Sequence, residues 1–261
     1  MTPTTHQRPI PARPALVSAL LCAALLALVP ASTAATGSSS SSATTRRIAY
    51  PLTVSLLSPK LAYWAPVVSQ IAARRAPSSA ASVVTQLSMI TGDGTQNILL
   101  LLKEQKLSPS QDWYEVRLPI LPNNSVGWVP RSALGNIYPV TTHLYVNREN
   151  QTLVLKRNGV PIFSTRVGVG RTYWPTPAGQ FYIRDKLTDF GNPFYGPIAF
   201  GTSARSAVLT DWPGGGFVGV HGTNEPGLIP GHISHGCIRL INTAIVKLAQ
   251  LMPVGTPLTI S

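Results

Sequence analysis

The chain has 261 residues and a formal net charge of +12; 44% of the residues are hydrophobic and only 11% are charged. This composition excludes a disordered polycation, because there is enough apolar sequence for the cores of two small domains. The basic residues are scattered and do not gather with aromatic residues on one element, so we expect no nucleic-acid partner.

The N-terminus has the pattern of an export signal. Arg8 and Arg13 precede an apolar run over residues 15–29, and small residues follow that run. This order is typical of a secretory signal, here residues 1–34. The alternative is an uncleaved membrane anchor, because the run approaches the ~20 residues of a spanning helix. Either way we expect an exported chain, in the periplasm or cell wall, with a membrane tether only if the signal is uncleaved.

A short polar segment separates the signal from the first folded region. Residues 35–45 are almost entirely Ser, Thr, Ala and Gly, which predicts a flexible linker. Residues 63–75 fit either a helix or strands. The strands expected after the linker are 53–57, 82–90, 97–103, 113–118 and 127–129. Short strands with close turns predict a small β-barrel.

The end of this first region carries a resemblance. Trp113-Tyr114-Glu115-Val116, followed by Gly127-Trp128-Val129, resembles the end of bacterial SH3-like modules. The resemblance implies an SH3-like β domain over residues 46–137. We expect Trp113 and Trp128 to be core residues, because aromatic residues in alternating strands usually pack.

Residues 138–261 form the second predicted domain, mainly β with one short C-terminal helix. Arg157-Asn158-Gly159 predicts a tight hairpin turn. Asn242 is a candidate N-cap for the helix, whose apolar residues fall on one face. The expected strands are 143–147, 152–156, 161–167, 179–184, 217–220 and 257–260.

Cys237 is the only cysteine outside the predicted signal, since Cys22 lies within the apolar run. An exported chain with one cysteine cannot close an intramolecular disulfide, so we interpret Cys237 as a reactive thiol. A free thiol has a pKa of about 8.5 and needs a base and a positive field to react as a thiolate. His221 and His235 are candidate bases, and Arg239 is a candidate source of positive field.

Two other interpretations of this cluster stay open. One is an inert cysteine in a turn, which leaves the surrounding histidines and arginine unexplained. The other is a zinc site made of His232, His235, Cys237 and His221. Its spacing matches none of the common zinc patterns, so we expect neither a metal nor a cofactor. The backbone N–H groups of Gly236 and Cys237 are candidate oxyanion donors.

The segments around His221 and Cys237 match the motifs of a known enzyme family. His221-Gly222-Thr223-Asn224 and Ser234-His235-Gly236-Cys237-Ile238-Arg239-Leu240 resemble the signature of the L,D-transpeptidases with a YkuD-type catalytic domain. Thr176-Pro177-Ala178-Gly179-Gln180-Phe181 matches their T-P-x-G-x-F segment. The resemblance implies a β-sandwich-like catalytic domain over residues 138–261, with the cysteine in a cleft under a mobile lid.

The resemblance also implies the chemistry. Cys237 would attack the L-centre carbonyl of the third residue of a peptidoglycan tetrapeptide stem. D-Alanine leaves, a thioester forms, and the amine of another stem completes a 3→3 cross-link. His221 is the implied proton donor and acceptor, oriented by the carbonyl of Gly222. The implied supporting residues are Ser234, His235, Gly236, Arg239 and Thr176.

Two further functions stay open on the sequence. Water in place of the amine would make the enzyme an L,D-carboxypeptidase. A non-catalytic wall-binding protein, working through the SH3-like region, is the alternative from another class. The expected partners are peptidoglycan stem peptides, as donor and as acceptor.

Overall fold

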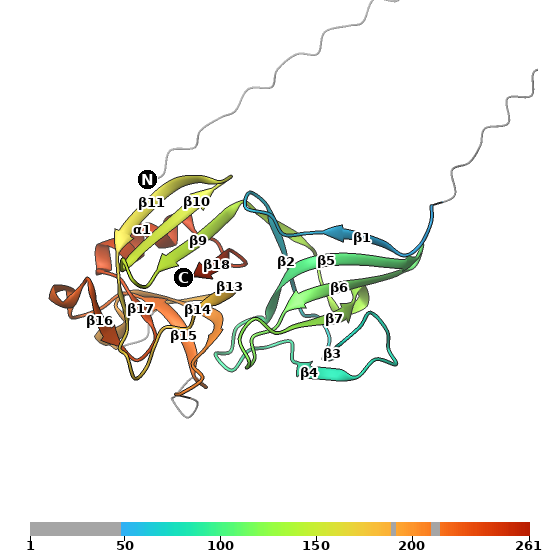
Figure 1. Ribbon diagram of the computed structural model, residues 1–261, viewed down its shortest axis with the longest axis horizontal. Helices are drawn as coiled ribbons and strands as arrows, with labels where there is room; N and C mark the ends of the chain where they lie inside the picture. Colours follow the sequence, from blue (N-terminus) through green and yellow to red (C-terminus); the bar gives the residue numbers. More distant parts are fainter. Residues whose placement is uncertain (1–47, 189–191, 210–214) are drawn as a thin grey trace, which may run out of the picture. The chain divides into compact units, whose positions relative to one another are not determined.

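The computed structural model describes residues 48–188, 192–209 and 215–261, and Arg47–Ser261 forms one compact unit (Figure 1). The predicted signal over residues 1–34 and the linker over residues 35–45 lie outside the described residues. Across the described ranges, no helix has the length and apolarity needed to cross a membrane.

The first sheet has the strand order β4-β3-β7-β6-β5-β2-β8, with β1 paired to β5. Every strand expected in this region is present, and β5 extends beyond its predicted end. The turn η1 (Arg131–Ala133) follows β7. The strands are β1 (Leu52–Ser55), β2 (Ala62–Pro66), β3 (Ile71–Arg74), β4 (Val83–Leu87), β5 (Ile98–Ser108), β6 (Gln111–Arg117), β7 (Val126–Pro130) and β8 (Tyr138–Val140).

Residues 63–75, which fit both helix and strand on sequence, contribute to β2 and β3. The pairing of β2 with β5 explains why this segment forms strands and not a helix. The apolar first half of β5 is buried at every position, so it packs on both faces. β2 pairs antiparallel with it, Ala65 opposite Leu99. Pro66 is the last residue of β2, where its missing N–H removes no bond from the strand interior.

The second sheet has the order β11-β10-β9-β18-β13-β14-β15-β17-β12-β16. Asn158 and Gly159 both have positive φ, as the predicted hairpin turn between β10 and β11 requires. The strands are β9 (Thr142–Asn147), β10 (Thr152–Arg157), β11 (Val160–Arg166), β12 (Gly168–Gly170), β13 (Gly179–Thr188), β14 (Ile198–Arg205), β15 (Phe217–His221), β16 (Gly231–Ser234), β17 (Ile238–Arg239) and β18 (Pro257–Ile260). Short turns η2 (Pro193–Tyr195) and η3 (Pro226–Leu228) lie on either side of β15.

The helix α1 (Asn242–Leu251) is the one α-helix among the described residues, so the protein is mainly β. Ile245 and Leu248 are buried in the core of the second sheet, as the predicted apolar face requires. The expected cap is wrong. Ile241 occupies the N-cap position and Asn242 is the first helical residue. Its Oδ1 instead accepts a hydrogen bond from the Thr223 N–H at 2.9 Å.

A small third core joins strands of both sheets. It combines Ile98 and Leu100 of β5 with Tyr182 of β13, which is fully buried. The Tyr182 hydroxyl donates to the Ile98 carbonyl at 2.9 Å. A buried hydroxyl needs such a partner, so this bond ties the second sheet to the first.

Candidate active site

A cavity lies where β15 and β17 end beside η2. It collects five of the residues that the sequence singled out. Gly222, Gly236 and Thr176 do not line it. Among the described lining residues, Arg239 carries the only formal charge. The lining residues are Phe194, Tyr195, Ser206, Leu209, Gly216, Phe217, Val218, His221, Ser234, His235, Cys237 and Arg239.

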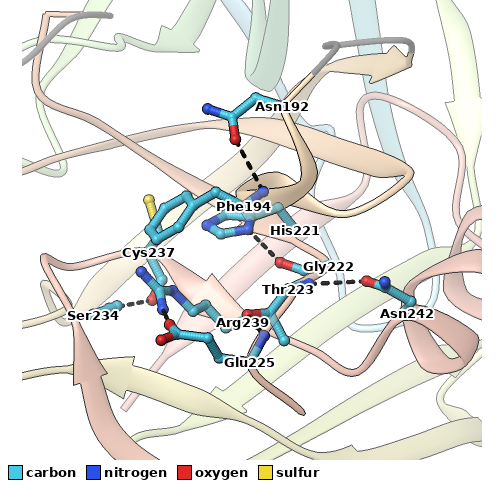
Figure 2. Close-up of polar contacts among 10 residues, drawn as sticks. All are labelled: Asn192, Phe194, His221, Gly222, Thr223, Glu225, Ser234, Cys237, Arg239 and Asn242. Atoms are coloured by element: carbon cyan, nitrogen blue, oxygen red, sulfur yellow. Dashed lines mark hydrogen bonds and ion pairs between the residues drawn. The ribbon is translucent and has the colours of Figure 1, made fainter. Parts of the chain in front are cut away.

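His221 is the last residue of β15 and is 1% exposed. Its Nδ1 lies 2.6 Å from the Gly222 carbonyl oxygen (Figure 2). A carbonyl only accepts, so Nδ1 carries the proton and Nε2 of the neutral ring does not. Nε2 is buried and has no partner within the described chain. Burial lowers the pKa of His221 to about 4, so the ring is neutral at pH 7.

The position of the His221 backbone depends on a close approach between two glycines. A Cβ on Gly222 would come within 3.0 Å of the Gly196 Cα and would collide with the Asn242 side chain. Gly196 has φ 65°, a conformation that favours glycine. The bond from Thr223 to Asn242 fixes the segment after His221 (Figure 2). These contacts require glycine at both positions.

Cys237 is a free, half-buried thiol between β16 and β17. The Gly219 N–H donates to its Sγ at 3.4 Å. Burial raises the pKa of Cys237, while the Gly219 bond and the charge of Arg239 oppose that rise. A Cβ built on Gly219 would lie 3.9 Å from Sγ and 3.8 Å from Cδ2 of His221. Thiol and imidazole therefore share the space above Gly219, and both are neutral at rest.

The turn that carries Cys237 is held by two buried hydroxyls. Ser234 Oγ donates to the Cys237 carbonyl at 2.6 Å and accepts from the Gly236 N–H at 3.1 Å. Thr176 Oγ1 donates to the Gly236 carbonyl and accepts from the Gly170 N–H, both at 2.8 Å. The expectation that the Gly236 N–H serves an oxyanion is wrong, because Ser234 already accepts it.

Arg239 is buried in β17 and faces the cavity. Its Nη1 lies 3.3 Å from Glu225 Oε2, and its guanidinium carbon lies 4.2 Å from the centre of the Phe194 ring. Glu225 is half exposed, so solvent screens this ion pair and it adds little stability. The pair and the ring hold the cation beside the thiol.

Aromatic rings cover two sides of the site. Tyr195 meets the His221 ring edge to face at 5.1 Å, and Phe194 lies 6.1 Å from the same ring. On the other side, Trp174 lies 4.3 Å from the ring of His235. Phe194 and Tyr195 contribute to the burial of the His221 imidazole, and burial lowers its pKa.

The other histidine of the possible zinc set points elsewhere. His232 Nδ1 donates to the Gly170 carbonyl at 3.0 Å. Over the described residues, no three His, Cys, Asp or Glu side chains come close enough to hold a metal ion.

Sequence reasoning missed two residues that position the site, Gly219 and Tyr195, and singled out Asn242 without its bond to Thr223. Gly219 precedes His221 by two positions, so it lies on the same face of β15. That spacing was the one available signal. Asn242 and Tyr195 reach the site through contacts across the fold, which no local pattern reveals.

Three comparisons bear on the kind of site this is. A family model described as the L,D-transpeptidase catalytic domain, YkuD, matches residues 141–260. The chain is 32% identical over 124 residues to the putative L,D-transpeptidase YkuD of Bacillus subtilis, covering 48% of this chain and 68% of that protein. It is 33% identical over 136 residues to the putative L,D-transpeptidase YqjB of the same organism, covering 48% and 74%.

Solved structures give a similar match. A crystal structure of a mutant Enterococcus faecium L,D-transpeptidase aligns with 27% identity and a TM-score of 0.36. The alignment covers 46% of this chain and 48% of that one, so the match spans about half of the solved chain.

Proposed function

Because this chain belongs to the L,D-transpeptidase enzymes, with the YkuD-type catalytic domain in residues 141–260, we propose that it is an exported cysteine transpeptidase of the peptidoglycan layer. Its donor is a tetrapeptide stem and its acceptor an amine of a second stem. The basic chain suits the anionic polymers of a cell envelope.

The bond from His221 to the Gly222 carbonyl is the observation that carries the proposal. It leaves Nε2 unprotonated, buried and beside the cavity that holds Cys237. A neutral imidazole with a free nitrogen can take the thiol proton as the sulfur attacks. The raised pKa of Cys237 favours this order, with proton removal during attack and no stored thiolate.

The Cys237 thiol and the His221 imidazole together account for every bond and proton in the reaction. Sγ bonds to the carbonyl carbon of the third stem residue while His221 Nε2 takes the thiol proton. The imidazolium returns that proton to the amine of D-alanine as the C–N bond breaks, leaving a thioester. An acceptor amine then attacks the thioester, its proton passes to His221, and the thiolate leaves and is reprotonated. The product is a 3→3 cross-link.

The supporting residues act around these steps. Arg239 supplies positive charge near the developing oxyanion and suits a substrate carboxylate. Ser234 and Thr176 hold the turn of Cys237 through Gly236, and His235 packs against Trp174. Phe194 and Tyr195 would act as the lid.

The domain division is also part of the proposal. It consists of a signal over residues 1–34, a linker over residues 35–45, an SH3-like β domain over residues 46–137 and the catalytic domain over residues 138–261. The pairing of β6 with β7, which brings Glu115 opposite Trp128, supports the SH3-like assignment. Export rests on the apolar N-terminal run.

The test is chemical. Wild-type protein incubated with a tetrapeptide stem should gain the mass of a tripeptide acyl group on Cys237. Cys237→Ser should gain none and should melt at the same temperature as wild type, because oxygen replaces sulfur at a half-buried position. An adduct or 3→3 dimers formed by Cys237→Ser would refute the mechanism. Tripeptide without dimers would identify an L,D-carboxypeptidase.

A further inference from the structure

A second cavity of about 410 Å³ opens within the same compact unit, away from Cys237. It shares no lining residue with the catalytic cavity. Its size falls in the ~300–1,000 Å³ range of small-molecule sites. Two features of its wall, an aromatic pair and a charged pair, limit what it can bind.

The aromatic pair is Trp64 of β2 and Tyr138 of β8. Their rings stack with centroids 4.7 Å apart and an interplanar angle of 27°. Gly255 lies so close to the Trp64 ring that any side chain there would collide with it. Trp64 is thus fixed between Gly255 and Tyr138. Tyr138 remains 42% exposed, so part of its surface is open to a ligand.

The charged pair comes from β13. The pairing of β13 with β14 shifts register between Ile183 and Asp185, an irregularity of the kind that re-aims side chains. Arg184 and Asp185 both line the cavity, together with the next residue, Lys186. Asp185 accepts from the Gly201 N–H at 2.8 Å and from Thr95 Oγ1 at 3.5 Å. Burial raises its pKa.

Arg184 is 5% exposed, yet its Nε and Nη1 have no hydrogen-bond partner within the described chain. Its guanidinium carbon lies 4.1 Å from the centre of the Phe217 ring. A buried guanidinium with unpaired donors is costly. Phe217 also lines the catalytic cavity, so the guanidinium packs against that wall, and the ligand groups of the second cavity are those of Asp185 and Lys186.

We propose that this cavity binds an N-acetylated saccharide. A pyranose ring has an apolar C–H face, which packs on an aromatic ring, and a rim of hydroxyls that both donate and accept. The rim matches the carboxylate of Asp185 and the ammonium of Lys186, which also lines the cavity. Val254 and Ile98 line the same cavity and would cover an acetamido methyl group. A purely apolar ligand would leave the polar groups of Asp185, Lys186 and Gln96 in the cavity wall without a partner. The choice of N-acetylated sugars rests on the proposed action on peptidoglycan.

The experiment titrates the full chain with N-acetylglucosamine tetramer while the Trp64 indole resonance is followed by NMR. Saturable shifts should appear. Tyr138→Ala should weaken binding about threefold to tenfold, as expected for the loss of one stacking ring. Asp185→Asn should weaken it similarly. Tyr50→Ala, which removes an exposed tyrosine outside the cavity, is the matched control and should leave binding unchanged.

Absence of saturable shifts at Trp64 would overturn the proposal, as would equal binding by Tyr138→Ala and wild type. Equal affinity for a glucose tetramer would overturn the N-acetyl preference, and binding of inorganic phosphate in its place would assign the cavity to anions. None of these readouts uses the thioester. Tyr138→Ala should still form the adduct on Cys237, so failure here is distinct from failure of the proposed function.

Discussion

At the scale of single residues, the site depends on which hydrogen bonds are already made. The Gly222 carbonyl fixes the tautomer of His221, the Gly219 N–H contacts Sγ, and Thr176 bridges two backbone segments. Each contact decides which atom remains available for chemistry. Nε2 of His221 has no partner in the described chain, and Sγ of Cys237 accepts one weak bond, from Gly219.

Thr176→Val tests the buried bridge. Valine has nearly the same shape but no hydroxyl, so the Gly170 N–H and the Gly236 carbonyl lose their partner. We expect a loss of about 2 to 6 kcal/mol in unfolding free energy, at about 1 to 3 kcal/mol for each of the two orphaned groups. We also expect acylation to slow by about 10- to 100-fold from misplacement of the Cys237 turn. Denaturant unfolding and adduct mass spectrometry measure the two effects.

The control for Thr176 is Thr176→Ser, which retains the hydroxyl. Thr176→Ser should acylate almost as fast as wild type, and faster than Thr176→Val, even if it is less stable than wild type. If Thr176→Val acylates at the wild-type rate, the hydroxyl does not position the turn.

His221 predicts a pH dependence of stability. Its pKa of about 4 in the folded protein is below the ~6.5 of an unfolded histidine, so the unfolded chain binds the proton more tightly. The stabilisation is complete above about pH 6.5 and is lost as pH falls toward 4. Between those values, wild type should lose on the order of 3 kcal/mol more than His221→Gln. Urea unfolding at both pH values gives this difference.

A second histidine supplies the comparison. His143 also has a pKa lowered to about 4 by burial, but it is only half-buried. His143→Gln should remove a smaller part of the dependence, and the double variant should remove both parts. Identical pH profiles for wild type and His221→Gln would contradict the assignment of a neutral, buried base.

At the scale of elements, the helix α1 supports the strand that carries the base. Asn242 is its first residue, and its side chain holds the segment after β15 through the Thr223 N–H. The same Asn242 Oδ1 packs so closely on Gly222 and Gly196 that neither accepts a side chain. The helix start and the end of β15 therefore form one structural unit.

Asn242→Ala should loosen that unit. The Thr223 N–H loses its acceptor, and we expect a loss of about 1 to 3 kcal/mol with a lower acylation rate. Asn242→Asp retains the acceptor oxygen and should keep the rate close to wild type. Equal rates for alanine and aspartate would show that this bond does not position His221. Stopped-flow or quenched acylation with a tetrapeptide stem provides the comparison.

Strands and turns were easier to predict from the sequence than were hydrogen bonds between residues far apart in the chain. The hairpin at Asn158-Gly159 and the strand that ends at His221 follow from local patterns, and the structure confirms them. Asn242 was wrong as a cap because its side chain is committed to Thr223, 19 residues away. The expected oxyanion role of the Gly236 N–H was wrong because Ser234, two residues before it, accepts that N–H. Thr176 reaches Gly236 across 60 residues, a pairing that only the folded sheet creates.

At the scale of the whole molecule, the two sheets share a core. Tyr182 of β13 lies among apolar residues of β5, and its hydroxyl bonds to Ile98. Asn123, in the turn before β7, also accepts from the Arg205 N–H at 3.0 Å and donates to its carbonyl at 2.7 Å. Residues of both proposed domains are thus buried together.

This shared core predicts one cooperative unfolding transition. Tyr182→Phe keeps the ring but orphans the Ile98 carbonyl, so it should lower stability by about 1 to 3 kcal/mol without splitting the transition. Differential scanning calorimetry would show a single peak moved to lower temperature. Two separate peaks in wild type would contradict the shared core. Tyr63→Phe, at a partly buried position in the first sheet, is the matched control.

The partner of His221 has a consequence for the conditions in which the enzyme works. Many catalytic histidines are oriented by a carboxylate, which titrates and can be replaced by a single substitution. Here a peptide oxygen fills that role. It bears no formal charge, stays an acceptor throughout the pH range in which the fold survives, and belongs to no side chain. The orientation of the base is therefore insensitive to acidification and to most point mutations, a property that fits the export proposed above.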